Sequence, residues 1–121
     1  MVGAFVVVFA YGTAVHVLQL MGSGLAPRPT APAPLNAYFV ALTVLDPLTA
    51  GLLARGRRSG VVLAVLVLVT DAAANAYADY VTAGSGVAAR VGQAGIAALA
   101  VVMLISAPML WRHSSPDRAP R

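Results

Sequence analysis

The chain of 121 residues contains no cysteine, no lysine and no glutamate, and only 10% of its residues are charged. The lack of cysteine excludes disulfides, thiolate metal sites and cysteine nucleophiles. A soluble domain usually has about a quarter of its residues charged. This chain instead is 60% hydrophobic, and its mean hydropathy is +0.83. Its composition is therefore that of a membrane protein.

Four apolar stretches cover residues 4–22, 36–54, 60–83 and 87–111. Each is long enough for a helix to cross the hydrocarbon core, which takes about 17–25 residues. They predict an all-α fold, an integral membrane four-helix bundle that forms a single domain over residues 1–111. The first stretch lacks the basic region of a signal peptide, so we expect it to be retained. Residues 112–121 are polar and predict a disordered cytoplasmic tail.

Arginine placement predicts the orientation of the bundle. With four spans, one side of the membrane holds six arginines: Arg55, Arg57, Arg58, Arg112, Arg118 and Arg121. The other side holds Arg28 and Arg90. The positive-inside rule therefore predicts that both termini are cytoplasmic. We interpret these arginines as topology signals and predict no nucleic-acid partner. The expected location is the inner (plasma) membrane of a bacterium, as a multi-pass protein with the lipid bilayer as its partner.

Several polar residues stand inside the apolar segments. Asp71, Asn75 and Asp79 follow one another at intervals of four residues, so they share one face of the third segment. Asp46 precedes Pro47 in the second segment, and a proline there frees the carbonyl of Thr43 from its helical hydrogen bond. An aspartate near the bilayer centre costs roughly 2.5–3.5 kcal/mol. Some compensating arrangement must therefore surround these carboxylates.

Counted along each segment at about 1.5 Å per residue, these polar residues fall in the outer half of the membrane or near its midplane, and the cytoplasmic half is almost purely apolar. This placement predicts a polar pocket in the outer half of the bundle, closed by an apolar floor. The candidate catalytic residues are Asp46, Asp71 and His16, and the candidate ligand-binding residues are Asn75, Tyr77, Gln19, Gln93 and Thr43. Simpler roles remain open for some of them. Asn75 and Gln93 can serve only as contacts between helices. Asp79 can be solvated or paired with Arg90.

A carboxyl group in an apolar pocket favours its protonated form and can act as an acid, with a histidine or a second carboxylate as base. This chemistry suits isomerisation or cyclisation of a lipid or another apolar small molecule. The first-segment histidine, "LDPLTAGLL" and "TDAAANAYADY" resemble small bacterial four-helix membrane proteins and, more distantly, the emopamil-binding-protein (EXPERA) superfamily. The resemblance implies a pocket for a lipophilic ligand formed by His16, Asp46, Asp71 and Asn75. Unlike that superfamily, the chain has no glutamate and places its Asp-Pro pair mid-span.

Two other functions fit the same residues. A small proton- or cation-coupled transporter that works as a homodimer also needs membrane carboxylates, although His16 stands where small multidrug exporters have a glutamate. A non-catalytic membrane subunit would use the polar cluster to hold helices together. The pattern predicts no cofactor, and no metal site, because one histidine with scattered aspartates lacks ligand spacing.

Overall fold

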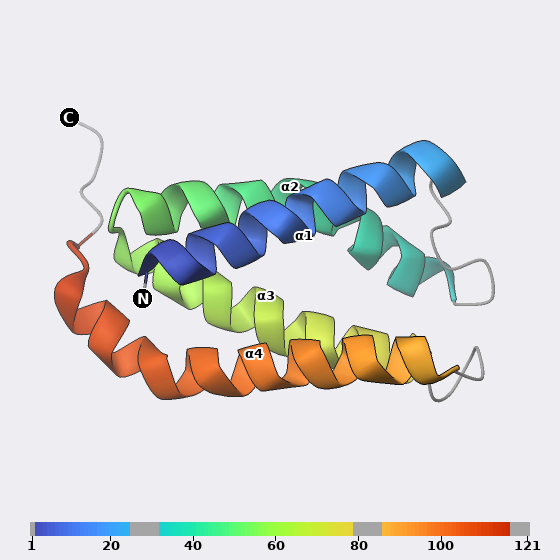
Figure 1. Ribbon diagram of the computed structural model, residues 1–121. Helices are drawn as coiled ribbons and strands as arrows, with labels where there is room; N and C mark the ends of the chain where they lie inside the picture. The colour runs from blue at the N-terminus through green and yellow to red at the C-terminus, as the bar shows by residue number, and fades with distance from the viewer. Residues whose placement is uncertain (1, 25–31, 79–85, 117–121) are drawn as a thin grey trace.

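The computed structural model describes residues 2–24, 32–78 and 86–116, and within these ranges the chain forms four long helices (Figure 1). They are α1 (Val2–Ser23), α2 (Ala33–Ala54), α3 (Arg58–Tyr77) and α4 (Val87–His113). Each is long and apolar enough to cross a membrane. The predicted all-α fold with four candidate membrane spans is confirmed. The third predicted span continued to residue 83, but residues 79–83 lie outside the described ranges.

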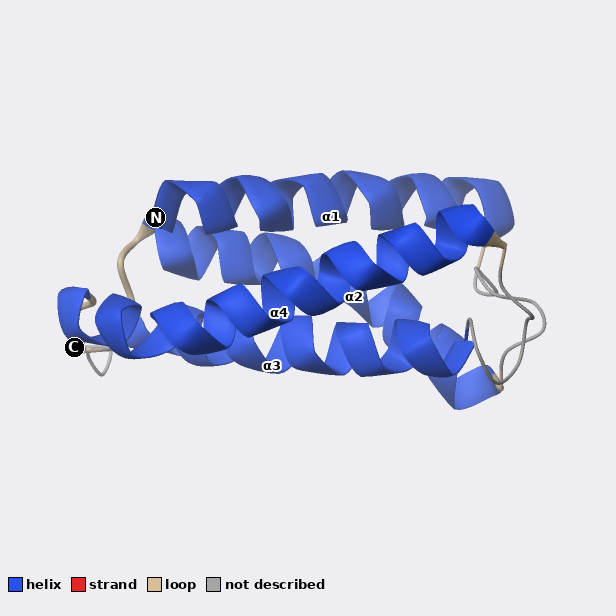
Figure 2. Cartoon of the chain, turned by 60° about the horizontal axis from the view of Figure 1, so that its bottom comes forward, coloured by secondary structure: helices blue, strands red, loops and turns tan. Residues whose placement is uncertain are grey.

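The helices follow one another up and down, and each packs against the next in the sequence (Figures 1 and 2). α1 lies against α2, α2 against α3, and α3 against α4. Among the described residues, α1 and α4 do not pack closely together. The start of α1, the α2–α3 turn and the end of α4 lie at the same end of the bundle (Figure 1). We call it the arginine end, after Arg55, Arg57, Arg58 and Arg112.

The α2–α3 turn is closed by backbone hydrogen bonds. Gly56 adopts φ = 65°, a left-handed conformation that glycine reaches at little cost. Its N–H donates to the carbonyl of Leu53 (2.9 Å), and the N–H of Arg57 donates to that of Leu52 (3.1 Å). These two bonds form a Schellman motif, which satisfies carbonyls that the end of a helix leaves free. The turn therefore ends α2 sharply and allows α3 to return along it.

The half of the bundle toward the arginine end is filled mainly by apolar side chains. Its buried members come from all four helices: Phe5, Phe9, Leu53, Val61, Ala64, Met103 and Leu110. The buried polar residue Ser106 of α4 also lies in this half. This packing fills one half of the bundle mainly with apolar side chains, and it forms the floor of the cavity described below.

Gly60 lies where the backbones of α2 and α3 approach each other closely. A Cβ placed on Gly60 would lie 2.7 Å from the backbone nitrogen of Leu53 and 2.8 Å from the carbonyl carbon of Leu52. Backbone atoms in a tight turn cannot move aside as a flexible side chain does. The absence of a side chain at Gly60 is therefore required for the two helices to lie together immediately after the turn.

We expect Gly60→Ala to lower the free energy of unfolding by about 1–3 kcal/mol, the usual cost of forcing an extra carbon into a packed core. The matched control is Gly51→Ala on the adjoining turn of α2, where a Cβ meets no atom within 4 Å. The measurement is unfolding by sodium dodecyl sulfate in mixed micelles. Equal stability of the two variants would contradict this account of α2–α3 packing.

Candidate functional site

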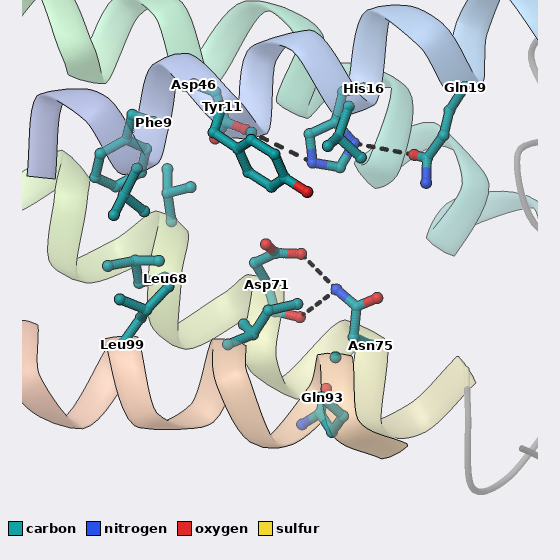
Figure 3. A pocket seen from close by; sticks show the side chains of 16 residues that line it. Phe9, Tyr11, His16, Gln19, Asp46, Leu68, Asp71, Asn75, Gln93 and Leu99 are labelled. Carbon is teal, nitrogen blue, oxygen red and sulfur yellow. Dashed lines mark hydrogen bonds and ion pairs between the residues drawn. The ribbon is translucent and has the colours of Figure 1, made fainter. Parts of the chain in front are cut away.

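A cavity of about 310 Å³ lies among the four helices, in the half of the bundle away from the arginine end. Figure 3 shows two walls that face each other across it: α1 with Asp46 of α2, and α3 with α4. The polar side chains that line it are Tyr11, His16, Gln19, Asp46, Asp71, Asn75 and Gln93. The rest of the lining is apolar apart from two glycines. The fold thus gathers polar groups from four apolar helices around one space.

His16 and Asp46 form the centre of the first wall. His16 Nε2 lies 3.6 Å from Asp46 Oδ2, and His16 Nδ1 donates to Gln19 Oε1 at 3.2 Å. Because the amide oxygen of Gln19 can only accept, this bond leaves the proton on Nδ1 and turns Nε2 toward the carboxyl group. Asp46 is only 4% exposed. His16 Nε2 and the buried carboxyl group of Asp46 therefore face each other at ion-pair distance.

Gly12 makes room for this pair. A Cβ on Gly12 would lie 2.5 Å from Asp46 Oδ2 and 3.3 Å from its Cγ. The carboxyl group of α2 therefore rests directly against the backbone of α1, one turn before His16. Asp46 also precedes Pro47, which lies inside α2 and cannot supply the N–H that would bond to the carbonyl of Thr43. The close contact at Gly12 and the proline at position 47 thus place two polar groups, the Asp46 carboxyl group and the Thr43 carbonyl, near the middle of α2.

The second wall centres on Asp71 and Asn75 of α3. Asn75 Nδ2 donates to Asp71 Oδ1 at 2.6 Å and to the backbone carbonyl of Asp71 at 3.0 Å. Their spacing of four residues places the two side chains on one helix face. The buried amide therefore holds the Asp71 carboxyl in place, opposite the first wall (Figure 3).

Gln93 extends this wall onto α4. Its Nε2 donates to the backbone carbonyl of Ala72 at 2.9 Å, which joins α3 to α4. That bond fixes the amide so that Gln93 Oε1 is buried without a hydrogen-bond partner among the described residues. A buried acceptor without a donor is costly, and this one belongs to a side chain that lines the cavity. The cavity lining therefore includes one buried acceptor that no donor among the described residues satisfies.

The cavity reaches the surface between α1 and α4. Tyr11 of α1 lines it and is 73% exposed, and its hydroxyl points toward the space between the walls (Figure 3). Gly92 of α4 lines it from the other side and is also exposed. Since these two helices do not pack closely together, the mouth opens sideways, across the faces that the apolar helices present outward.

The structure brings together most of the residues predicted from the sequence. His16, Asp46, Asp71, Asn75, Gln19 and Gln93 all line the cavity. Thr43 does not line it, and its buried hydroxyl has no hydrogen-bond partner in the described part of the chain. Tyr77 is 46% exposed and also lies outside the lining. Asp79, expected near water or Arg90, falls outside the described residues.

Tyr11 and Gly92 also line the cavity, although neither was among the residues predicted from the sequence. Tyr11 precedes Val15 by four residues and therefore shares a face of the first segment with it, which was a signal available in the sequence. Gly92 offered no such signal, because a glycine in an apolar helix is common and its place at the mouth depends on how α4 packs. Both residues belong to the rim and not to the polar centre.

Neither a cluster of metal-ligating side chains among the described residues nor similarity to a known protein indicates a function for this cavity. Within residues 2–24, 32–78 and 86–116, no group of three histidine, cysteine, aspartate or glutamate side chains is placed to hold a metal ion. No known protein family, curated protein or solved structure matches the chain. The resemblance to the EXPERA superfamily therefore stays a prediction, and the chemistry of the cavity is what bears on function.

We expect Gly12→Ala to push the Asp46 carboxyl group away from His16, because the new methyl group occupies its place. Gly22→Ala is the matched control on the same helix, since a Cβ there meets no atom within 4 Å. Nitrogen-15 NMR of the His16 ring measures the change, and the chain has one other histidine, His113, for reference. Ring shifts that stay the same in Gly12→Ala would contradict the observed pairing.

Proposed function

We propose that the protein binds a small, mostly apolar molecule in the cavity between its four helices and moves a proton to or from it. The observation that carries this proposal is that two polar walls, each with an aspartate, face each other across about 310 Å³ of space inside an apolar bundle. Small-molecule sites are typically concave and mostly apolar, with a few polar groups that converge on the ligand. Polar residues that served only as contacts between packed helices would leave no cavity between them.

Proton transfer follows from the arrangement of the first wall. His16 is held by Gln19 with Nε2 turned to Asp46, so this pair can take up a proton at one position and release it at the other. Asp71 lies across the cavity and is held by Asn75. A ligand between the walls can thus receive a proton on one side and lose one on the other, as isomerisation or cyclisation requires.

The sideways mouth between α1 and α4 supports a ligand that dissolves in the bilayer. An apolar molecule partitions into hydrocarbon before it meets the protein, and Tyr11 and Gly92 mark a path that requires no passage through water. In this proposal the cavity lies in the outer half of an inner (plasma) membrane and both termini are cytoplasmic. The positive-inside rule supports that orientation through the arginine end.

A proton- or cation-coupled transporter, working as a homodimer, is the second candidate because two carboxylates line one cavity. The apolar packing of Phe5, Leu53 and Met103 makes it the weaker one. A transporter has to expose its site to both sides in turn, and this packing fills the half of the bundle toward the arginine end. A purely structural subunit is disfavoured by the cavity itself.

Photoaffinity labelling tests the proposal. We expect a diazirine-bearing alkyl probe with an alcohol or amine head group to label α1, α3 and α4, and a carboxylate probe to fail because its negative charge would be buried in a mostly apolar cavity. Asp46→Asn and His16→Gln should each lower labelling roughly tenfold or more, because a hydrogen bond to a charged group is worth about 1.5–3 kcal/mol.

The control for these variants is Ser106→Ala, which alters a buried polar residue of α4 that does not line the cavity. It should label like the wild type. Labelling that is unchanged in both Asp46→Asn and His16→Gln, in variants that remain folded, would rule out the proposed function.

The mouth provides a separate prediction. We expect Gly92→Phe to slow photolabelling severalfold, because the ring would narrow the opening between α1 and α4. The matched control is Gly95→Phe, one turn further along the same helix. Gly95 is also exposed, a Cβ there also meets no atom within 4 Å, and it does not line the cavity. Equal labelling rates in the two variants would place the entrance elsewhere.

A further inference from the structure

The arginine end has a side-chain arrangement that the cavity does not use. The guanidinium carbon of Arg58, at the start of α3, lies 4.9 Å from the centre of the Trp111 ring near the end of α4. Such cation–π contacts hold a guanidinium in place. Arg58 Nε is nevertheless buried without a hydrogen-bond partner among the described residues. A buried donor without a partner is costly, so the hydrogen-bonding capacity of Arg58 is not fully used within the described part of the chain.

Backbone hydrogen bonds hold this region in shape. The N–H of Ser115, beyond the end of α4, donates to the carbonyl of Gly56 in the α2–α3 turn at 2.8 Å. The N–H of Arg58 donates in turn to the carbonyl of Ser115 at 3.2 Å. The segment after α4 is therefore joined to the turn. The relative positions of Arg58 and Trp111 are fixed by backbone as well as by side-chain contact.

Two apolar hollows adjoin this pair. One, of about 400 Å³, lies between α3 and α4 and includes Leu104 and Pro108. The other, of about 460 Å³, includes Arg58 itself and Leu52 of α2. Three residues line both hollows and form a ridge between them: Val62, Leu66 and Trp111. Two shallow apolar hollows thus meet at this ridge, and the Arg58 side chain lines one of them.

Charge at this end is positive. Arg55, Arg57 and Arg112 lie near Arg58, in the α2–α3 turn and the last turn of α4. The two carboxylates that the described ranges contain, Asp46 and Asp71, line the cavity in the other half of the bundle. A partner for this end should therefore bring negative charge together with apolar surface.

We propose that Arg58, Trp111 and the two hollows form a binding site for an anionic phospholipid. The phosphate accepts from the Arg58 guanidinium, and one acyl chain lies in each hollow on either side of the Val62–Leu66 ridge. Free phosphate would leave the hollows empty, and a neutral lipid would leave the positive charge unmatched. This site depends on insertion of the helices into a membrane and is independent of the ligand proposed for the cavity.

Native mass spectrometry of the full-length protein in mixed micelles with phosphatidylglycerol and phosphatidylcholine tests the site. We expect the wild type to retain phosphatidylglycerol preferentially and Arg58→Gln to lower that preference about fivefold, the factor for one arginine at an anionic lipid surface. Leu66→Trp should lower retention of both lipids by filling the hollows without changing charge. Arg58→Lys keeps the positive charge but loses the planar guanidinium group, so the preference for phosphatidylglycerol should fall by roughly twofold.

Arg112→Gln is the charge-matched control, because it removes one positive charge from the same end at an exposed residue that lines neither hollow. It should retain most of the preference. An equal loss in Arg112→Gln and Arg58→Gln would overturn the site in favour of diffuse surface charge. Unchanged lipid retention in Leu66→Trp, or displacement of the lipid by inorganic phosphate, would overturn it as well. Arg58→Lys keeps the test decisive where Arg58→Gln does not fold.

Discussion

The contact between Asp46 and the backbone of α1 at Gly12 is the constraint on which the rest of the site depends. A carboxyl group midway along an apolar helix is costly unless a neighbour compensates it. Here the compensation comes from His16, and it is possible because Gly12 has no side chain in the space that Asp46 Oδ2 occupies. Once α1 and α2 meet in this way, α3 brings Asp71 and Asn75 to the opposite wall.

The two halves of the bundle are packed differently. Toward the arginine end, Gly60 allows α2 and α3 to lie in close contact, and apolar side chains fill the interior. Away from that end, α1 and α4 do not pack closely together within the described residues, and the cavity occupies the space. The same chain therefore combines a well-packed base, which holds the helices together, with an open polar half that can accept a ligand.

Much of the fold and the polar centre of the site follow from the sequence, for a physical reason. Hydrocarbon admits few structures other than helices at these lengths, so the apolar runs predicted the spans, and a carboxylate such as Asp71 within them was conspicuous. The sequence could not predict which helices pack together. The roles of Gly12 and Gly92, and the exclusion of Thr43 from the cavity lining, depend on that packing. Single-helix periodicity says which residues share a face, but not what that face meets.

The central claim is that the cavity holds a specific small molecule drawn from the membrane. The most direct measurement is native mass spectrometry of protein purified gently from its membrane, with identification of whatever remains bound after phospholipids are stripped. We predict one defined species in the wild type, at one copy per chain, that is lost in Asp46→Asn while Gly95→Phe retains it. A wild-type chain that carries no such species, or a species retained equally by Asp46→Asn, would contradict the account.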